Sequence, residues 1–121
     1  MSSMQEFQQK SCKPCEGGVP PLTKSQAESY LADMQGWELD ADSKQISKFF
    51  LMKNFSAAVQ LIRSIAELAE KEGHHPDLHL TNYRKLTVVL STHAIGGLSE
   101  NNFILASKIE SLPKELKRGG A

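Results

Sequence analysis

The amino-acid sequence predicts an α+β fold in which three helices pack on one face of a four-stranded antiparallel sheet. Three observations predict it. Apolar residues recur at helical spacing in three segments, and strand-length runs of apolar or alternating residues occupy four others. Turn-forming residues separate the members of each strand pair, which favours two hairpins. The order α-β-β-α-β-β-α joins these hairpins into one sheet and leaves its second face open.

The N-terminal part of the chain supplies a leader, a short helix and the first hairpin. Residues 1–22 are polar and then rich in glycine and proline, so we expect a loosely ordered leader. A capping box that starts at Thr23 predicts a short amphipathic helix, which ends at Gly36. Residues 37–39 and 45–52 have the composition of strands, and the turn-forming residues between them complete a hairpin.

The middle of the chain holds the strongest helical pattern and the second hairpin. Asn54 is the predicted N-cap of a helix that continues to about Glu72, where Gly73 stops it. Residues 78–82 and 85–92 are candidate strands. In the second of these, large apolar residues alternate with threonine, valine and serine, as expected of a strand that buries one face.

The C-terminal part contains the last helix and a tail. Ser99 is the predicted N-cap of this helix, and Pro113 ends it because proline cannot continue a helix. We expect residues 114–121 to fray. The predicted organisation is therefore a single domain, residues 23–113, between a leader and a tail.

Length and composition exclude several classes of protein. The 121 residues suffice for one domain with a core, and 14 basic residues balance 14 acidic ones. Because the chain lacks a basic stripe, we expect no direct contact with nucleic acid. Its apolar runs are too short for a membrane span, and its first twenty residues do not resemble a secretory signal. We expect a cytoplasmic protein, with an organelle or the nucleus as alternatives.

Histidines are the most informative residues of the chain. Three of the four lie in two short segments flanked by turn residues, with His74 and His75 before Pro76, and His93 after a predicted strand. Histidine is the side chain that exchanges protons near neutral pH. Each one alone is compatible with an ordinary surface turn, but together they predict a proton-handling pocket where the two segments meet. The fourth, His79, lies within a strand and is expected to be exposed.

The local sequence predicts how these histidines are placed. His74 and His75 follow a helix C-terminus, whose dipole favours the imidazolium form and should raise the pKa of both. Glu70 lies one turn before His74 and could orient or charge it. If the preceding strand stays regular, its alternation places His93 on the open face of the sheet.

Metal binding is the main alternative for these residues. Three histidines can hold a catalytic zinc ion, but the adjacent side chains of His74 and His75 diverge, and the helical H-E-x-x-H spacing is missing. Cys12 and Cys15 form a single C-x-x-C pair, which supplies two of the four ligands of a structural zinc site. We expect no metal. For the two cysteines, an incidental pair, metal binding and a disulfide stay open.

Two motifs together resemble a known family. His-His-Pro at 74–76, followed by Thr-His-x-x-Gly-Gly-Leu at 92–98, is similar to the signature of the pterin-4a-carbinolamine dehydratases. The similarity covers roughly residues 12–112. It implies the α+β fold predicted above and dehydration of 4a-hydroxytetrahydropterin to quinonoid dihydropterin. It also implies a homodimer or homotetramer that needs no metal or cofactor of its own.

The resemblance also implies a set of site residues. His74, His75 and His93 form the catalytic triad of histidines. We expect His74 and His93 to transfer protons while His75 binds and orients the pterin. The substrate-binding candidates are Trp37 at the pocket wall, Glu70, Pro76, Thr92 and Asn102.

One position departs from the family pattern. Asn102 stands where many members carry aspartate in the first turn of the last helix. An asparagine can still accept a hydrogen bond, but it brings no charge that would raise the pKa of a histidine.

A non-catalytic role in protein binding is the alternative function. Animal members of the family also act as a dimerisation cofactor for a homeodomain transcription factor, and plant relatives assist assembly of the carbon-fixing enzyme. Such a role would use a helix face or a sheet edge. Exposed apolar residues on the last helix, such as Phe103 or Ile104, would favour it.

Overall fold

The structure is a computed structural model that describes residues 3–10, 12 and 20–118. Four helices and four strands are present in this part of the chain. None of the described helices has both the length and the apolar character needed to span a bilayer. The elements are α1 (Ser3–Gln8), α2 (Lys24–Leu31), β1 (Glu38–Leu39), β2 (Ile46–Leu51), α3 (Phe55–Glu72), β3 (Asp77–Thr81), β4 (Lys85–Leu90), a 3₁₀ turn (His93–Ile95) and α4 (Glu100–Glu110).

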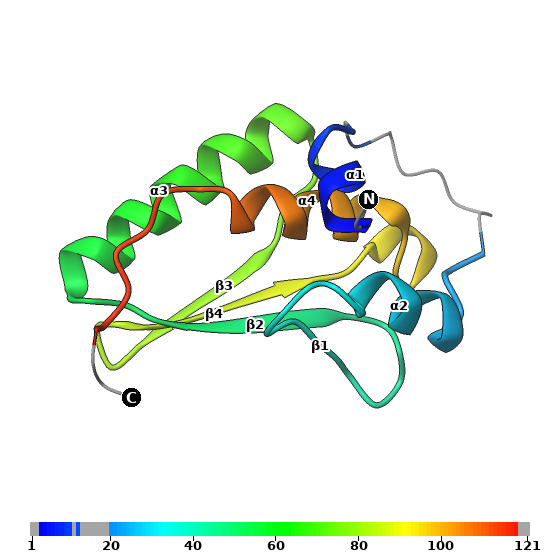
Figure 1. The fold of residues 1–121 in the computed structure, drawn as a ribbon, viewed down its shortest axis with the longest axis horizontal. Helices are drawn as coiled ribbons and strands as arrows, with labels where there is room; N and C mark the ends of the chain where they lie inside the picture. The colour runs from blue at the N-terminus through cyan, green and yellow to red at the C-terminus, as the bar shows by residue number, and fades with distance from the viewer. Residues whose placement is uncertain (1–2, 11, 13–19, 119–121) are drawn as a thin grey trace.

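The strands form one antiparallel sheet in the order β1-β2-β4-β3. Both predicted hairpins are present, because β1 pairs with β2 and β3 with β4. The central strands β2 and β4 join the hairpins, with Lys48 opposite Val88. Helices α1, α3 and α4 lie together above the sheet (Figure 1). The α+β prediction, with helices on one face of a four-stranded antiparallel sheet, is confirmed, and α1 adds a helix to the three that were expected.

Alternation along β4 separates the two faces of the sheet. Leu86, Val88 and Leu90 are fully buried beneath the helices, whereas Thr87 between them is half-buried on the opposite face. Phe49, the partner of Thr87 in β2, is exposed on that open face. The core therefore forms a single layer between the sheet and the helices, as the period of two in the sequence predicts.

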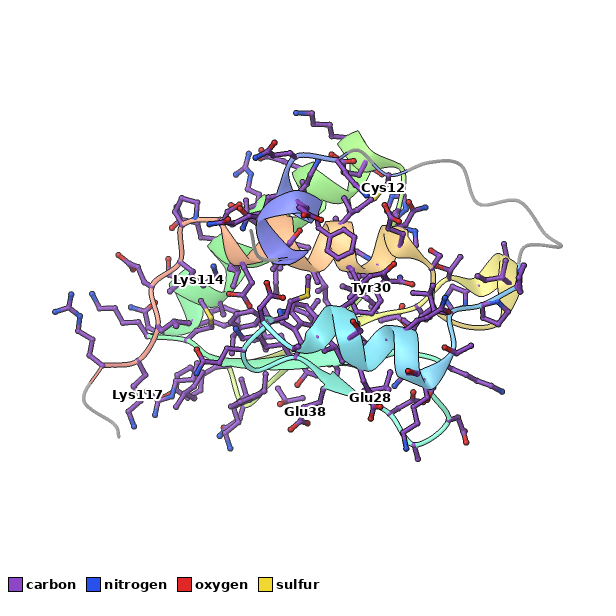
Figure 2. All side chains as sticks on the ribbon, turned by 45° about the vertical axis from the view of Figure 1, so that its right-hand side comes forward. Cys12, Glu28, Tyr30, Glu38, Lys114 and Lys117 are labelled. Carbon is purple, nitrogen blue, oxygen red and sulfur yellow. The ribbon has the colours of Figure 1, made fainter. Side chains whose placement is uncertain are left out.

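Helix α4 is the centre of this layer. It lies between α3 and α1 above the sheet, and its side chains are buried almost all the way round (Figure 1). The ring of Phe103 packs against Tyr30 of α2 and Phe7 of α1, with centroid distances of 5.1 and 6.0 Å. Figure 2 shows Tyr30 between α2 and α4. A helix buried on every side shows no clear amphipathic stripe, so its central place could not be predicted from periodicity.

Several local predictions are confirmed. Thr23 and Gln26 form the capping box of α2, and the side chain of Asn54 accepts a hydrogen bond from the third residue of α3. Gly73 ends α3 in the left-handed conformation. One boundary differs, because α2 ends at Leu31, several residues before the glycine that was expected to end it.

The prediction of a loosely ordered leader is wrong for residues 3–10. This segment contains α1, whose Phe7 is buried and packs edge-on against Tyr30 at 5.0 Å. The Gln8 side chain donates a hydrogen bond to the Ser107 carbonyl of α4. A six-residue helix does not form alone in water, so burial against α4 stabilises it. Residues 11 and 13–19 lie outside the described part of the leader.

The tail also departs from its prediction. Leu116 pairs with Met52 in an antiparallel bridge, and the Lys117 N–H donates to the Leu51 carbonyl at 3.0 Å. These backbone hydrogen bonds pair the tail with the end of β2, on the edge away from β4 and beyond the residues that pair with β1. The expected fraying is therefore wrong for residues 115–117, while residues 119–121 lie outside the described part.

Candidate active site

The end of α3 places two adjacent histidines in opposite environments. Gly73 adopts φ +68°, and the N–H groups of Gly73 and His74 both donate to the Ala69 carbonyl, at 2.8 and 3.3 Å. A side chain at Gly73 would have open space, so it is the left-handed backbone that favours glycine here. This reversal buries His74, which is 8 % exposed, and leaves His75 in solvent.

A tight turn after β4 places His93. The Thr92 N–H donates to the Gly97 carbonyl at 2.7 Å, and His93 begins the 3₁₀ turn between them. A Cβ atom on Gly97 would lie 2.8 Å from Pro21, so only glycine lets the leader pass this closely. Because β4 ends at Leu90, its alternation does not reach His93, and the predicted placement on the open face loses its basis.

Behind His74 lies a buried network of uncharged polar groups. Asn102 is completely buried, and its Nδ2 lies 2.8 Å from Nε2 of His74. Its Oδ1 accepts hydrogen bonds from the Ser99 N–H and the Thr92 hydroxyl, both at 2.9 Å. The hydroxyls of Thr92 and Ser99 are themselves 2.8 Å apart. The network ties the end of α3, the end of β4 and the start of α4 together.

Glu70 contacts a different histidine from the one predicted. Its Oε2 lies 2.5 Å from Nε2 of His75, and both side chains are exposed. The left-handed turn at Gly73 directs His74 into the core, which leaves His75 to reach back over the last turn of α3. The expectation that Glu70 orients His74 is therefore wrong, and Glu70 pairs with His75.

The pKa of His74 depends on its burial and on the other two histidines of the predicted site. Burial lowers the pKa of His74, and the charges of His75 and His93 lower it further. The segment of His74 and His75 is joined to the segment of His93 through Asn102, which hydrogen-bonds both His74 and Thr92. The raised pKa expected for His74 from the helix dipole is wrong, because the loss of hydration of the imidazolium on burial has a larger effect on this pKa than the dipole has.

The remaining substrate-binding candidates are placed less favourably. Thr92 and Asn102 are buried behind His74, so neither can touch a bound ligand directly in this arrangement. Trp37 is buried, and its indole N–H donates to Glu110 at 2.9 Å. Glu110, the partner of Trp37, lies about 12 Å along α4 from Asn102 at 1.5 Å per residue. Within a single chain, Trp37 therefore does not lie beside the histidines. Pro76 is half-buried beside them.

The described residues provide no metal-binding cluster of three histidine, cysteine, aspartate or glutamate side chains. The Cys12 N–H donates to Glu72 at the end of α3 at 2.9 Å, and its thiol donates to the Asn101 carbonyl near the start of α4 at 3.7 Å. Cys15 lies outside the described part of the chain.

Two residues near the site, Glu72 and Ser99, were not predicted as site residues from the sequence. Burial alone would raise the pKa of Glu72, but the Lys108 ammonium 2.7 Å away, with the Cys12 N–H and Lys71, lowers it overall. Ser99 was predicted only as a helix cap. Its Ser-x-x-Asn spacing is the signal that could have placed it in the network with Asn102.

Comparison with known proteins identifies the family. The profile described as "Pterin 4 alpha carbinolamine dehydratase" matches residues 20–112. A relative from Nitrosomonas eutropha that carries the name of a pterin-4-alpha-carbinolamine dehydratase is 44 % identical over 113 residues, which cover 93 % of this chain and 97 % of the relative. "Pterin-4-alpha-carbinolamine dehydratase 2, mitochondrial" from Arabidopsis thaliana is 38 % identical over 93 % of this chain and 62 % of that protein.

A solved structure agrees with this result. The crystal structure of a "transcriptional coactivator/pterin dehydratase" from Brucella melitensis superimposes with a TM-score of 0.70 and 31 % sequence identity, covering 75 % of this chain and 96 % of that one. From these matches in sequence and structure, the chain belongs to the pterin 4 alpha carbinolamine dehydratase family.

Proposed function

We propose that this protein dehydrates 4a-hydroxytetrahydropterin to quinonoid dihydropterin by histidine acid–base catalysis, a step of tetrahydropterin recycling. The observation that carries the proposal is that Asn102 hydrogen-bonds both His74 and Thr92, which ties the segment of His74 and His75 to the segment of His93. Membership of the family supports the same reaction.

The reaction needs two proton transfers. The hydroxyl on C4a must gain a proton to leave as water when the C4a–O bond breaks. The lone pair of the neighbouring ring nitrogen then forms the C4a=N bond, and that nitrogen loses its proton to a base. Imidazoles suit both roles because their unperturbed pKa, about 6.5, lies close to neutral pH.

Exposure divides the roles among the histidines. His75 and His93 reach solvent, so they can contact a substrate and exchange protons with water. The Glu70 carboxylate 2.5 Å from His75 can orient that ring. We therefore assign proton transfer to His75 and His93, in place of the pair His74 and His93 expected from the sequence. Pro76, beside His75, is the substrate-binding candidate that this arrangement supports best.

A kinetic assay tests the proposal. The quinonoid product is followed by absorbance after 4a-hydroxytetrahydropterin is generated in the cuvette, and the rate is compared with uncatalysed decay. We expect His75→Ala and His93→Ala each to lower kcat/KM by about 10²–10⁴-fold. His79→Ala, an exposed histidine in β3, is the matched control and should keep the wild-type rate. A wild-type protein that does not exceed uncatalysed decay, or full activity in both site variants, would reject the proposal.

We also propose that the protein forms a homodimer or homotetramer. Phe55 and Val59 on the outer side of α3 are 56 % and 45 % exposed, although both are large apolar residues. Burial of such a face by a second copy would remove apolar surface from water. Light scattering across a dilution series should show an oligomer that Phe55→Ser weakens. A monomer at all concentrations would contradict this assignment.

Protein binding without catalysis is the second candidate function. The signs expected for it on the last helix are absent, because Phe103 and Ile104 are buried. A groove along α3, where Phe55 and Val59 lie among polar residues such as Arg63, is the observation that favours it. Full activity together with loss of oligomers in Phe55→Ser would assign the groove to self-association. If Phe55→Ser instead remains oligomeric but no longer binds a different protein that the wild type binds, this second function would be favoured.

A further inference from the structure

We propose that Asn102 holds His74 in its neutral form with the ring hydrogen on Nδ1, so that His74 donates a fixed hydrogen bond and does not carry a proton. Asn102 is a positioning residue in this proposal, since it is completely buried and acts only through His74. The statement about the hydrogen is independent of the reaction. Only its catalytic consequence rests on the function proposed above.

The orientation of the Asn102 amide is fixed by a backbone group. The Ser99 N–H can only donate, and it lies 2.9 Å from one of the two terminal atoms of the Asn102 side chain. That atom must therefore be the oxygen. The Thr92 hydroxyl donates to the same oxygen at 2.9 Å. The terminal atom that faces His74 is consequently the amide nitrogen, which has hydrogens and no lone pair to offer.

The amide nitrogen in turn decides the state of the imidazole. Nδ2 of Asn102 lies 2.8 Å from Nε2 of His74, so Nε2 must accept the hydrogen bond. A neutral imidazole that accepts at Nε2 has its hydrogen on Nδ1. The imidazolium form would place an N–H of the ring against an N–H of the amide. The protonated state of His74 therefore loses a hydrogen bond that the neutral state makes.

Reorientation of the amide does not relieve this conflict. A turned Asn102 would present its nitrogen to the Ser99 N–H and leave that partly buried donor without its acceptor, which is costly. The hydroxyls of Thr92 and Ser99 also hold each other at 2.8 Å. Burial of His74 and the charges of His75 and His93 disfavour the imidazolium in the same direction.

This tautomer determines what His74 can do in the reaction. Its lone pair is engaged by Asn102, so it cannot act as a base. It has no second proton, so it cannot act as a general acid. It can donate a hydrogen bond from Nδ1 to an acceptor on the pterin, while His75 and His93 transfer the protons. An aspartate at position 102 would instead accept from Nε2 and stabilise the imidazolium.

Nuclear magnetic resonance of the wild-type protein tests the proposal without substrate. Two-bond ¹H–¹⁵N correlation spectra distinguish a ring nitrogen that bears a hydrogen from one that does not. We expect Nδ1 of His74 to bear the hydrogen between about pH 6 and 8, where exposed histidines titrate. A hydrogen on Nε2, an even mixture of tautomers, or an imidazolium across this range would overturn the proposal.

The variant Asn102→Asp tests the cause. We expect Nε2 of His74 to bear a hydrogen in this variant, in either the neutral or the charged ring, so the population without a hydrogen on Nε2 should fall by about tenfold or more. Glu100→Gln is the matched control, since it changes one charge in the same turn of α4 at a side chain paired with Lys10. This control should keep the wild-type tautomer. A variant Asn102→Asp in which Nε2 of His74 still bears no hydrogen would overturn the proposal.

The assay of the same proteins separates this inference from the proposed function. In Asn102→Asp the kcat/KM profile should change its dependence on pH, because His74 acquires a charged form. In Glu100→Gln the profile should match that of the wild type. A wild-type protein without dehydratase activity would reject the function while the spectra still decide the tautomer.

Discussion

The two ends of α4 are held in place by different chemistry. At the N-terminal end, the side chains of Asn102, Thr92, Ser99 and His74 form a buried network of neutral hydrogen bonds. Each of its donors and acceptors has a defined direction. This end therefore fixes where a hydrogen lies as well as where a side chain lies.

The C-terminal end of α4 depends on charge. The Lys48 ammonium pairs with the Glu110 carboxylate, which also accepts the indole N–H of Trp37. The Lys114 ammonium donates to the carbonyls of Glu110 and Leu112 at 2.9 and 2.7 Å. Burial lowers the pKa of Lys114, partly offset by the charge of Glu110 and reinforced by that of Lys48. Figure 2 shows Lys114 on the side of the molecule where the tail leaves α4.

This difference separates proton control from packing. The energy of an ion pair depends mainly on the distance between the charges and little on angle. Such a pair can therefore hold a helix on a sheet without selecting one tautomer of a neighbouring histidine. Amide and hydroxyl groups in a buried site select one arrangement of hydrogens, because any other leaves a group unpaired. The histidines lie at the neutral end, where such control is useful, whereas Trp37 lies at the charged end.

The largest expected effect is on the neutral end. Asn102→Ala leaves the Ser99 N–H unpaired and removes one partner each from Thr92 and His74. We expect the free energy of unfolding to fall by about 2–4 kcal/mol, since each buried polar group left unpaired costs about 1–3 kcal/mol. Urea unfolding measures the change, and the exposed residue Gln60, changed to alanine, is the control. A loss below about 1 kcal/mol would show that the network tolerates a missing member.

A smaller effect is expected at the charged end. Glu110→Gln still accepts the Trp37 N–H but leaves the largely buried Lys48 without its counter-charge. We expect the free energy of unfolding to fall by about 1–2 kcal/mol, between the losses for exposed and for fully buried pairs, with no change in the dehydratase rate. Glu67→Gln is the matched control, because its partner Arg63 is exposed and such pairs contribute about 0–1 kcal/mol. Equal losses in the two variants would contradict the comparison.

Trp37→Phe sharpens the contrast between the two ends. It removes the N–H that reaches Glu110 while keeping most of the buried ring, so we expect a loss of about 1 kcal/mol in unfolding free energy. Within one subunit, Trp37 lies at the opposite end of α4 from the histidines, so the dehydratase rate and KM should be unchanged. A raised KM with normal stability would instead show that Trp37 lines a substrate site in the assembled protein.

The smallest expected effect is the pH dependence that one histidine gives to stability. The pKa of His74 is lowered in the folded state, chiefly by burial, so below about pH 6.5 the unfolded chain binds more protons than the folded one. The contribution of His74 to the free energy of unfolding is therefore fully present above about pH 6.5 and decreases as the pH falls toward the lowered pKa. Unfolding measured from pH 7.5 to 5.5 should show a smaller decline in His74→Gln than in wild type or in His79→Gln. Identical declines in all three would disprove the assignment.

Predictions from the sequence succeeded where local rules decide the outcome. The capping box at Thr23, the N-cap at Asn54 and the left-handed Gly73 depend on neighbours within four residues. The alternation of Leu86, Val88 and Leu90 follows from the period of a strand and identified the buried face of β4. The candidate site was predicted in part, because the spacing of the histidines and the family resemblance indicated which segments should meet.

The sequence by itself determined the order of helices and strands, the ends of several of them and the residue types at the histidine corner. The tertiary structure alone decided that α1 covers α4, that the tail pairs with β2, and that Glu70 contacts His75. It also decided the direction of the Asn102 amide, and with it the protonation of His74. The physical reason is burial. Local patterns set the backbone, but a pKa and a hydrogen-bond direction depend on which distant groups replace water around a side chain.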